Sequence, residues 1–284
     1  MRALLRSQRN EITEHEIYNR LAESCELDFN SRVLREVGEE ELRHYEIFRK
    51  YTQKDVEKDR IKIWYYYFLS RIFGVTFGVK LMERGEADAQ KTYEEIAQHI
   101  PEIQKVAQEE DEHEQKLLNE LDEEKLKYVG SIVLGLNDAL VELTGALAGF
   151  TLALNDANLV AVTGLITGIA ASLSMAASEY LSTKSDENEK HPKKAAIYTG
   201  GAYLTTVILL ILPYLLLENI LLSLAWTLVN AVTVIAFFTF YISVAKDEDF
   251  KERFAEMSTI SLGVAAISFA IGYLVKITLR VDVE

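Results

Sequence analysis

Two patterns of hydrophobic and polar positions divide the chain near residue 128. Before this point, apolar residues recur every three or four positions among charged ones, as at Ile17, Leu21 and Val37. Such spacing is typical of amphipathic helices that bury one face. It predicts four main helices, at about 10–26, 31–51, 59–97 and 101–127.

After Tyr128 the chain consists mostly of long apolar segments. Each reaches the ~20 residues that a helix needs to cross a ~30 Å hydrocarbon core. We therefore predict an all-α fold with a helical domain at 1–127 and a five-span membrane domain at 128–284. The predicted spans are 130–154, 159–182, 195–217, 219–245 and 257–279.

The junction between the two patterns contains no proline from Gln108 to Phe150, so one nearly continuous helix is expected there. Small residues recur four positions apart in the first two spans, at Gly145 and Gly149 and at Gly164 and Gly168. Such pairs allow helices to approach closely. They predict packing between the first two spans or a dimer interface.

The segment 61–82 is unusually apolar and aromatic. Lys62, Arg71 and Lys80 interrupt it, and charges inside a span are costly, so a core helix of the first domain is the preferred interpretation. In an alternative interpretation, the Trp64–Tyr67 cluster lies at the level of the lipid headgroups.

The distribution of charge supports the same division and excludes some functions. Residues 1–127 hold 29 of the 44 acidic and 21 of the 30 basic side chains. The net charge of −14 argues against nucleic acid as a partner, because phosphate binding needs a basic surface. The single cysteine, Cys25, excludes an intrachain disulfide.

Basic residues also predict the orientation in the membrane. The charged connections 183–194 and 246–256 lie on the same side as the first domain in a five-span topology. Because positive loops remain in the cytosol, we expect an integral protein of the plasma membrane with a cytosolic N-terminal domain and an outside C-terminus.

The first domain carries two Glu-x-x-His motifs on different predicted helices, Glu41-Leu-Arg-His44 and Glu110-Asp-Glu-His113. Two such motifs in a four-helix bundle, with one more Glu from each other helix, are the pattern of a di-iron carboxylate site. Glu11 is the candidate on the first helix, with Glu14 as its alternative. The third helix offers Glu83 and Glu86, between which the sequence does not decide.

A second group of candidate metal ligands lies inside the predicted spans. Asp138 and Glu142 are one helical turn apart in the first span, and Met175 and Glu179 are similarly spaced in the second. Ionisable residues inside a membrane are costly and usually functional. A thioether and carboxylates can bind and then release a transition-metal ion, although Glu179 could also reach water at a helix end.

Residues 10–125 resemble the erythrin or rubrerythrin branch of the ferritin-like superfamily. The resemblance rests on Glu11 with Tyr18, the two Glu-x-x-His motifs and the phrase GVTFGVKLMERGE. It implies a ferritin-like four-helix bundle that binds two iron ions, with manganese as an alternative, and supports ferroxidase, peroxidase or iron-sensing chemistry.

Residues 128–280 resemble the vacuolar iron transporter family through GLNDALVELTGALAGF and SLSMAASEYLSTKS. This resemblance implies a five-span homodimer that moves Fe²⁺ or Mn²⁺ out of the cytosol in exchange for protons. It places Asp138 and Met175 on the transport path. The family's glutamate-rich element between the second and third spans is short here, which makes sense if the first domain has taken over metal capture.

The leading hypothesis is therefore an exporter of Fe²⁺ or Mn²⁺ with a cytosolic di-iron domain. One alternative is a membrane-anchored ferroxidase or peroxide-reducing enzyme, for which five spans are more than an anchor needs. Another is an iron-responsive regulator that gates a pore.

Overall fold

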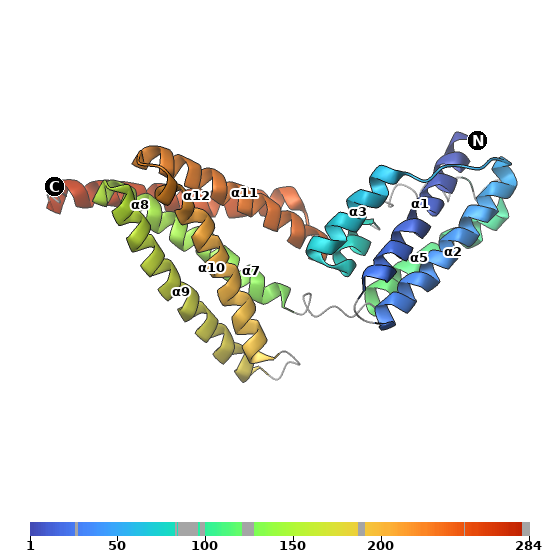
Figure 1. The fold of residues 1–284 in the computed structure, drawn as a ribbon, viewed down its shortest axis with the longest axis horizontal. Coiled ribbons are helices and arrows are strands. Elements are labelled where there is room, and N and C mark those ends of the chain that lie inside the picture. Colours follow the sequence, from blue (N-terminus) through green and yellow to red (C-terminus); the bar gives the residue numbers. More distant parts are fainter. Residues whose placement is uncertain are drawn as a thin grey trace. The chain divides into compact units, whose positions relative to one another are not determined.

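The chain folds into two compact units, Met1–Glu123 and Glu124–Glu284 (Figure 1). Every element in the described ranges is a helix, which confirms the predicted all-α fold. The structure is a computed structural model. It describes residues 1–25, 28–82, 84, 96, 100–120, 128–186, 191–246 and 248–279, and within the helix Pro101–Glu120 it describes the side chains of 101–110, 113 and 117.

The first unit is built from helices whose apolar faces pack against one another in more than one buried cluster. Ile17 and Leu21 of one helix pack with Leu34 and Val37 of the next, and all four are almost fully buried. Burying one such side chain contributes about 1.5–3 kcal/mol. The helices are α1 (Arg2–Ser24), α2 (Asp28–Thr52), α3 (Arg60–Phe73), a helical segment at 75–82, and α5 (Pro101–Glu120).

The predicted single helix at 59–97 is wrong at Gly74. Helix α3 begins after Asp59, whose carboxylate accepts hydrogen bonds from the backbone N–H groups of Ile61 and Lys62. It ends where Gly74 adopts φ 103°, a conformation that glycine tolerates and other residues rarely adopt. The Gly74 N–H closes the last turn on the Ser70 carbonyl at 2.9 Å. Much of the remaining predicted helix, including Glu83 and Glu86, lies outside the described residues.

The second unit contains five helical segments long and apolar enough to cross a membrane, as predicted. The first segment, Val129–Leu154, comprises α7 (Val129–Asp138), the π-helical turn η1 (Ala139–Leu143) and α8 (Thr144–Leu154). The other segments are α9 (Ala157–Ser185), α10 (Pro192–Leu216), α11 (Ile220–Lys246) and α12 (Phe250–Leu279).

The expected continuous helix through the junction is also wrong. Tyr128 lies in a turn with φ −105° and ψ 8°, and α7 begins only at the next residue. The aromatic ring of Tyr128 stacks on Tyr198 of α10, and its hydroxyl accepts a hydrogen bond from the His191 N–H. These contacts fix the start of the first span against the third.

The glycine pairs mediate close helix packing, with partners that differ partly from those expected. A Cβ added at Gly145 would lie 2.8 Å from Val264 of α12, and one at Gly149 would lie 3.1 Å from the Ser268 carbonyl oxygen. The first pair therefore packs against the fifth span rather than the second. Gly164 of α9 does face the first span, since its added Cβ would lie 2.6 Å from Leu147.

Replacing Gly272 by Ala is expected to destabilise the membrane unit by about 1–3 kcal/mol, because the new methyl group would collide with the Gly149 backbone. Gly263→Ala is the matched control on the same helix, where an added Cβ meets nothing within 4 Å. Thermal unfolding of the two variants in detergent measures the difference. Equal unfolding temperatures would contradict the close approach of α8 and α12.

Candidate functional site

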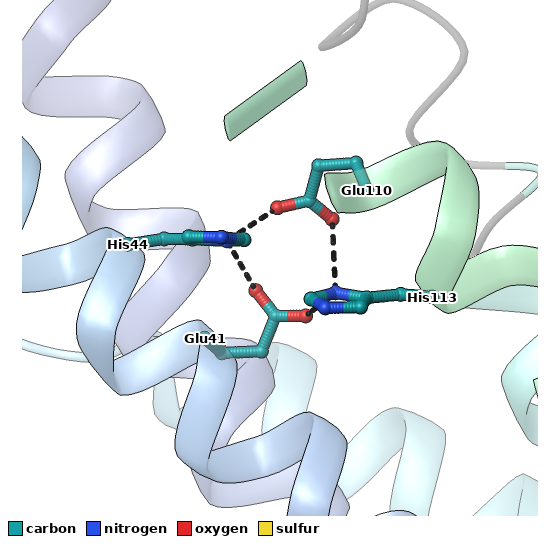
Figure 2. Close-up of side chains that lie close together, drawn as sticks. All are labelled: Glu41, His44, Glu110 and His113. Atoms are coloured by element: carbon teal, nitrogen blue, oxygen red, sulfur yellow. Dashed lines mark hydrogen bonds and ion pairs between the residues drawn. The ribbon is translucent and has the colours of Figure 1, made fainter. Parts of the chain in front are cut away.

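The two Glu-x-x-His motifs meet in the first unit, where they form a closed ring of four side chains (Figure 2). Glu41 and His44 come from α2, and Glu110 and His113 come from α5. His44 Nδ1 lies 2.8 Å from one oxygen of Glu110 and 3.7 Å from one oxygen of Glu41. The other oxygens of these carboxylates lie 4.0 Å and 3.4 Å from His113 Nδ1. Each carboxylate thus lies between both imidazoles, as a bridging ligand would.

Helix α1 adds two acids to this site. Glu11 Oε2 lies 3.6 Å from His44 Nδ1, and Glu11, Glu14 and Glu41 form a second group with ligand atoms within 4.8 Å of one another. Both α1 candidates, Glu11 and Glu14, are buried, so the structure places both at the site. The candidates from the third helix, Glu83 and Glu86, lie outside the described residues.

Burial makes this site electrostatically costly. Glu11, Glu41 and His44 are at most 1% exposed. Burial and the neighbouring charge of Glu110 raise the pKa of Glu11 well above its ordinary value, and the same causes raise the pKa of Glu41 to about 8. Burial lowers the pKa of His44, but the nearby carboxylates of Glu11, Glu110 and Glu41 outweigh that effect and raise the pKa. Protons therefore compensate the buried negative charge when no metal cation does.

Two buried atoms support a metal in this place. Among the described residues, neither Glu41 Oε2 nor His113 Nδ1 has a hydrogen-bond partner. Leaving a buried polar atom without a partner costs about 1–3 kcal/mol, and a metal ion would satisfy both. Carboxylates with imidazoles are a donor set for iron, manganese or zinc rather than for calcium. The residues that would hold the ions are Glu11, Glu14, Glu41, His44, Glu110 and His113.

The sequence did not reveal two acids outside the four-residue ring that contact its histidines, Glu109 and Glu40. Glu109 Oε2 lies 3.1 Å from His44 Nε2 and 3.0 Å from the Arg43 guanidinium, and Glu40 forms an ion pair with His113. Such partners orient a ligating imidazole. Each acid directly precedes a motif glutamate, so the sequence offers two adjacent candidates per helix and no means to assign their roles.

Metal binding by this site is expected to strengthen as the pH rises. Glu41, with a pKa of about 8, must lose a proton before it can bind a cation, so at least one proton is released per ion below that pH. The expected gain is at least about tenfold in affinity per pH unit, or roughly 100-fold or more between pH 6 and pH 8.

Mn²⁺ titrations of the purified chain at pH 6, 7 and 8 measure this dependence. A Glu110→Ala/His113→Ala variant reports the background from any other site. An affinity that does not change with pH would contradict the protonated cluster.

The acids of the first span lie at a break in its helical hydrogen-bond pattern. Asp138 ends α7 and Glu142 lies within η1, near the centre of the Val129–Leu154 segment. π-helical turns inside α-helices are rare and are frequently found at functional sites. The Leu140 carbonyl in this turn accepts a hydrogen bond from the Ser261 hydroxyl of α12 at 2.6 Å. A distant helix therefore supports the turn that carries the acids.

Neighbouring helices contact the span acids through hydroxyl groups. The Tyr203 hydroxyl of α10 donates to Glu142 at 3.2 Å, and the Ser131 hydroxyl of α7 donates to Glu179 at 2.6 Å. Met175 packs against the apolar core of the unit. Among the described residues, the carboxylates of Asp138, Glu142 and Glu179 do not together bring ligand atoms within 4.8 Å of one another. Tyr203 and Ser131 were not predicted.

A small cavity of about 40 Å³ lies between α7, α11 and the beginning of α12. Its lining includes Asn137, which directly precedes Asp138, together with Thr239 of α11 and Met257 of α12. A cavity of this size has room for about one water molecule. The cations Lys246 and Arg253 also line this cavity, whereas neither Asp138 nor Glu142 does.

Comparison with known proteins bears on the second unit. The model of the VIT family matches residues 129–192, which include the first span with its π-helical turn and the whole of α9. No curated protein and no solved structure matches the chain. The match does not reach the first unit, so the prediction of a ferritin-like four-helix bundle there stays a prediction. The VIT-family match and the five long apolar helices identify an integral membrane protein whose embedded part is similar to a family of metal-ion transporters.

Proposed function

We propose that the protein exports Fe²⁺ or Mn²⁺ from the cytosol across the plasma membrane. The observation that carries this proposal is the pair of acids at the π-helical turn. Asp138 is half-buried, and Glu142 is exposed although it lies near the middle of a spanning segment. A charged side chain there costs several kcal/mol in hydrocarbon, so it must face a polar path or a partner.

The exposure of Glu142 in a single chain also supports a homodimer. A second copy that covers this face would enclose the acids in a path between the subunits. There the carboxylates would bind a divalent ion in their charged form, with Met175 and Glu179 further along the same path. Protonation from the far side would weaken this binding, so exchange for protons is the expected coupling.

In this proposal the bundle delivers metal to the transporter. It is a cytosolic ferritin-like domain that captures two iron or manganese ions. Its buried carboxylates and imidazoles favour transition-metal cations over calcium, so it would provide selectivity before transport. The positive connections around 183–194 and 246–256 support the cytosolic orientation, with the C-terminus outside.

The buried cluster also supports a second candidate function, a ferroxidase or peroxide-reducing enzyme. Glu41 and Glu110 lie between the same two imidazoles, which is the arrangement that would hold two ions as a pair. Iron bound as such a pair supplies redox chemistry. The residues of the chain would hold the ions and exclude bulk water from them.

Transport by proteoliposomes separates these candidates. Vesicles that contain the purified chain are expected to accumulate Mn²⁺ or Fe²⁺ faster than empty vesicles, and a proton gradient of the correct direction should increase the rate. Oxidation of Fe²⁺ without any flux would favour the enzyme. If the rate of metal uptake did not depend on the proton gradient, the protein would still be a transporter, but exchange of the metal for protons would be rejected.

A further inference from the structure

Helix α3 exposes an apolar face that the first unit does not bury. Ile61, Trp64, Tyr65, Phe68 and Ile72 are between 47% and 83% exposed. Their spacing of three or four residues places them on one side of the helix. The opposite side, with Ile63 and Ser70, is buried against the core. A soluble surface rarely shows so many large apolar side chains together, and such patches mark interaction sites.

The charges of α3 indicate what this face contacts. The helix carries three exposed cations, Arg60, Lys62 and Arg71, and no acid, within a region where acids outnumber bases by 29 to 21. Helical periodicity places Arg60 and Arg71 along one border of the apolar face and Lys62 along the other. Helices that lie in a membrane surface have this composition, with apolar and aromatic residues on one side and cations beside them.

The aromatic residues are of the types that favour the headgroup region. Trp and Tyr combine an apolar ring with a polar group and are enriched where hydrocarbon meets water. Trp64 also has the guanidinium of Arg20 from α1 at 5.5 Å from its ring centre, but this guanidinium is paired with Glu16 at 2.8 Å and adds no net charge beside the face.

We propose that this face of α3 binds the surface of an anionic bilayer. Ile61, Trp64, Tyr65, Phe68 and Ile72 enter the headgroup region, and Arg60, Lys62 and Arg71 pair with lipid phosphates. Charge favours lipid over a second copy of the chain as the occupant. Two such faces would bring six cations together, whereas anionic lipids neutralise them. The proposal rests on the membrane anchoring of the chain and not on the metal that it carries.

The two tryptophans of the chain make a direct test possible. Trp226→Phe leaves Trp64 as the only reporter, and Trp64→Phe leaves Trp226, which lies in the spanning helix α11. Each full-length variant is placed in nanodiscs of phosphatidylcholine alone or with phosphatidylglycerol. Acrylamide then measures exposure to water, and headgroup-spin-labelled lipid measures contact with the membrane surface.

In the anionic nanodiscs, Trp64 is expected to emit at shorter wavelength and to be at least about threefold less accessible to acrylamide. The headgroup probe should quench it strongly. The same quantities for Trp226 should not depend on lipid charge. Adding Arg60→Gln/Arg71→Gln should abolish the dependence of Trp64 emission and quenching on lipid charge. The control is Arg32→Gln/Arg35→Gln, which removes two exposed cations from α2 and should leave this dependence unchanged.

Two results would overturn the proposal. Equal acrylamide access to Trp64 in both lipids, without quenching by the headgroup probe, would show that the face remains in water. Protection in both lipids that persists in detergent and is lost on dilution would instead identify a second copy as the occupant.

Discussion

Replacing Asp138 by Asn is expected to reduce the uptake of Fe²⁺ or Mn²⁺ into inside-out vesicles by at least about 100-fold. Asn preserves the shape of the side chain but removes the negative charge that the proposed path needs for a divalent ion. A loss of this size corresponds to roughly 3 kcal/mol of interaction with the ion in transit. Glu142→Gln should have a similar effect, because its carboxylate lies on the same π-helical turn.

Asp156→Asn is the matched control for this experiment. Asp156 belongs to the same unit, but its carboxylate caps α9 by accepting the Leu159 N–H at 2.8 Å. Asn caps helices as well as Asp does, so this variant should transport at the wild-type rate. If Asp138→Asn moved the metal as fast as this control, the assigned path would be wrong.

The Glu110→Ala/His113→Ala variant is expected to lose nearly all the metal that the bundle binds. Both side chains belong to the four-residue ring, and Ala leaves the Glu41 carboxylate and the His44 imidazole without their partners across it. Changing a residue that only hydrogen-bonds to a metal ligand typically lowers metal affinity by roughly 10–100-fold. The double variant removes two of the proposed ligands, so its loss of metal affinity should be larger. Metal content after purification, measured by mass spectrometry, provides the readout.

Transport by the same variant tests the role of the bundle. If the bundle captures metal for the transporter, flux should persist at high metal concentration and fall at low concentration. Glu102→Ala is the control on the same helix, because this exposed acid pairs with Lys50 and Tyr51 away from the cluster. Full metal content in the double variant would contradict the assigned ligands.

The features that depend on long stretches of sequence could be predicted. Five long apolar runs imply five helices that can span a membrane regardless of how those helices pack, and the structure contains them. The two motifs could be paired because a three-residue spacing places Glu41 with His44, and Glu110 with His113, on one side of each helix. Tertiary packing then brings the two sides together, as the bundle pattern implies.

Features that depend on a single residue in its tertiary context were not predictable. Gly74 could have continued the helix, and its positive φ is set by the fold around it. The π-helical turn is stabilised by Ser261, which is 121 residues from Leu140 in the sequence. The roles of Glu40 and Glu109 depend on how α2 and α5 face each other, which the spacing of acids within one helix does not reveal.

The π-helical turn also constrains how the first span can change in length. A π turn contains one residue more than the α-helical turn that it replaces, and each α-helical residue rotates the chain by about 100°. Deleting one residue between Ala139 and Leu143 would restore a regular helix. Because the π turn accommodates this residue within a single turn, the deletion would leave the rotation of α7 relative to α8 nearly unchanged and would remove only the widened turn beside Asp138 and Glu142. A deletion elsewhere in α7 or α8 would instead rotate one end of the span by about 100° relative to the other.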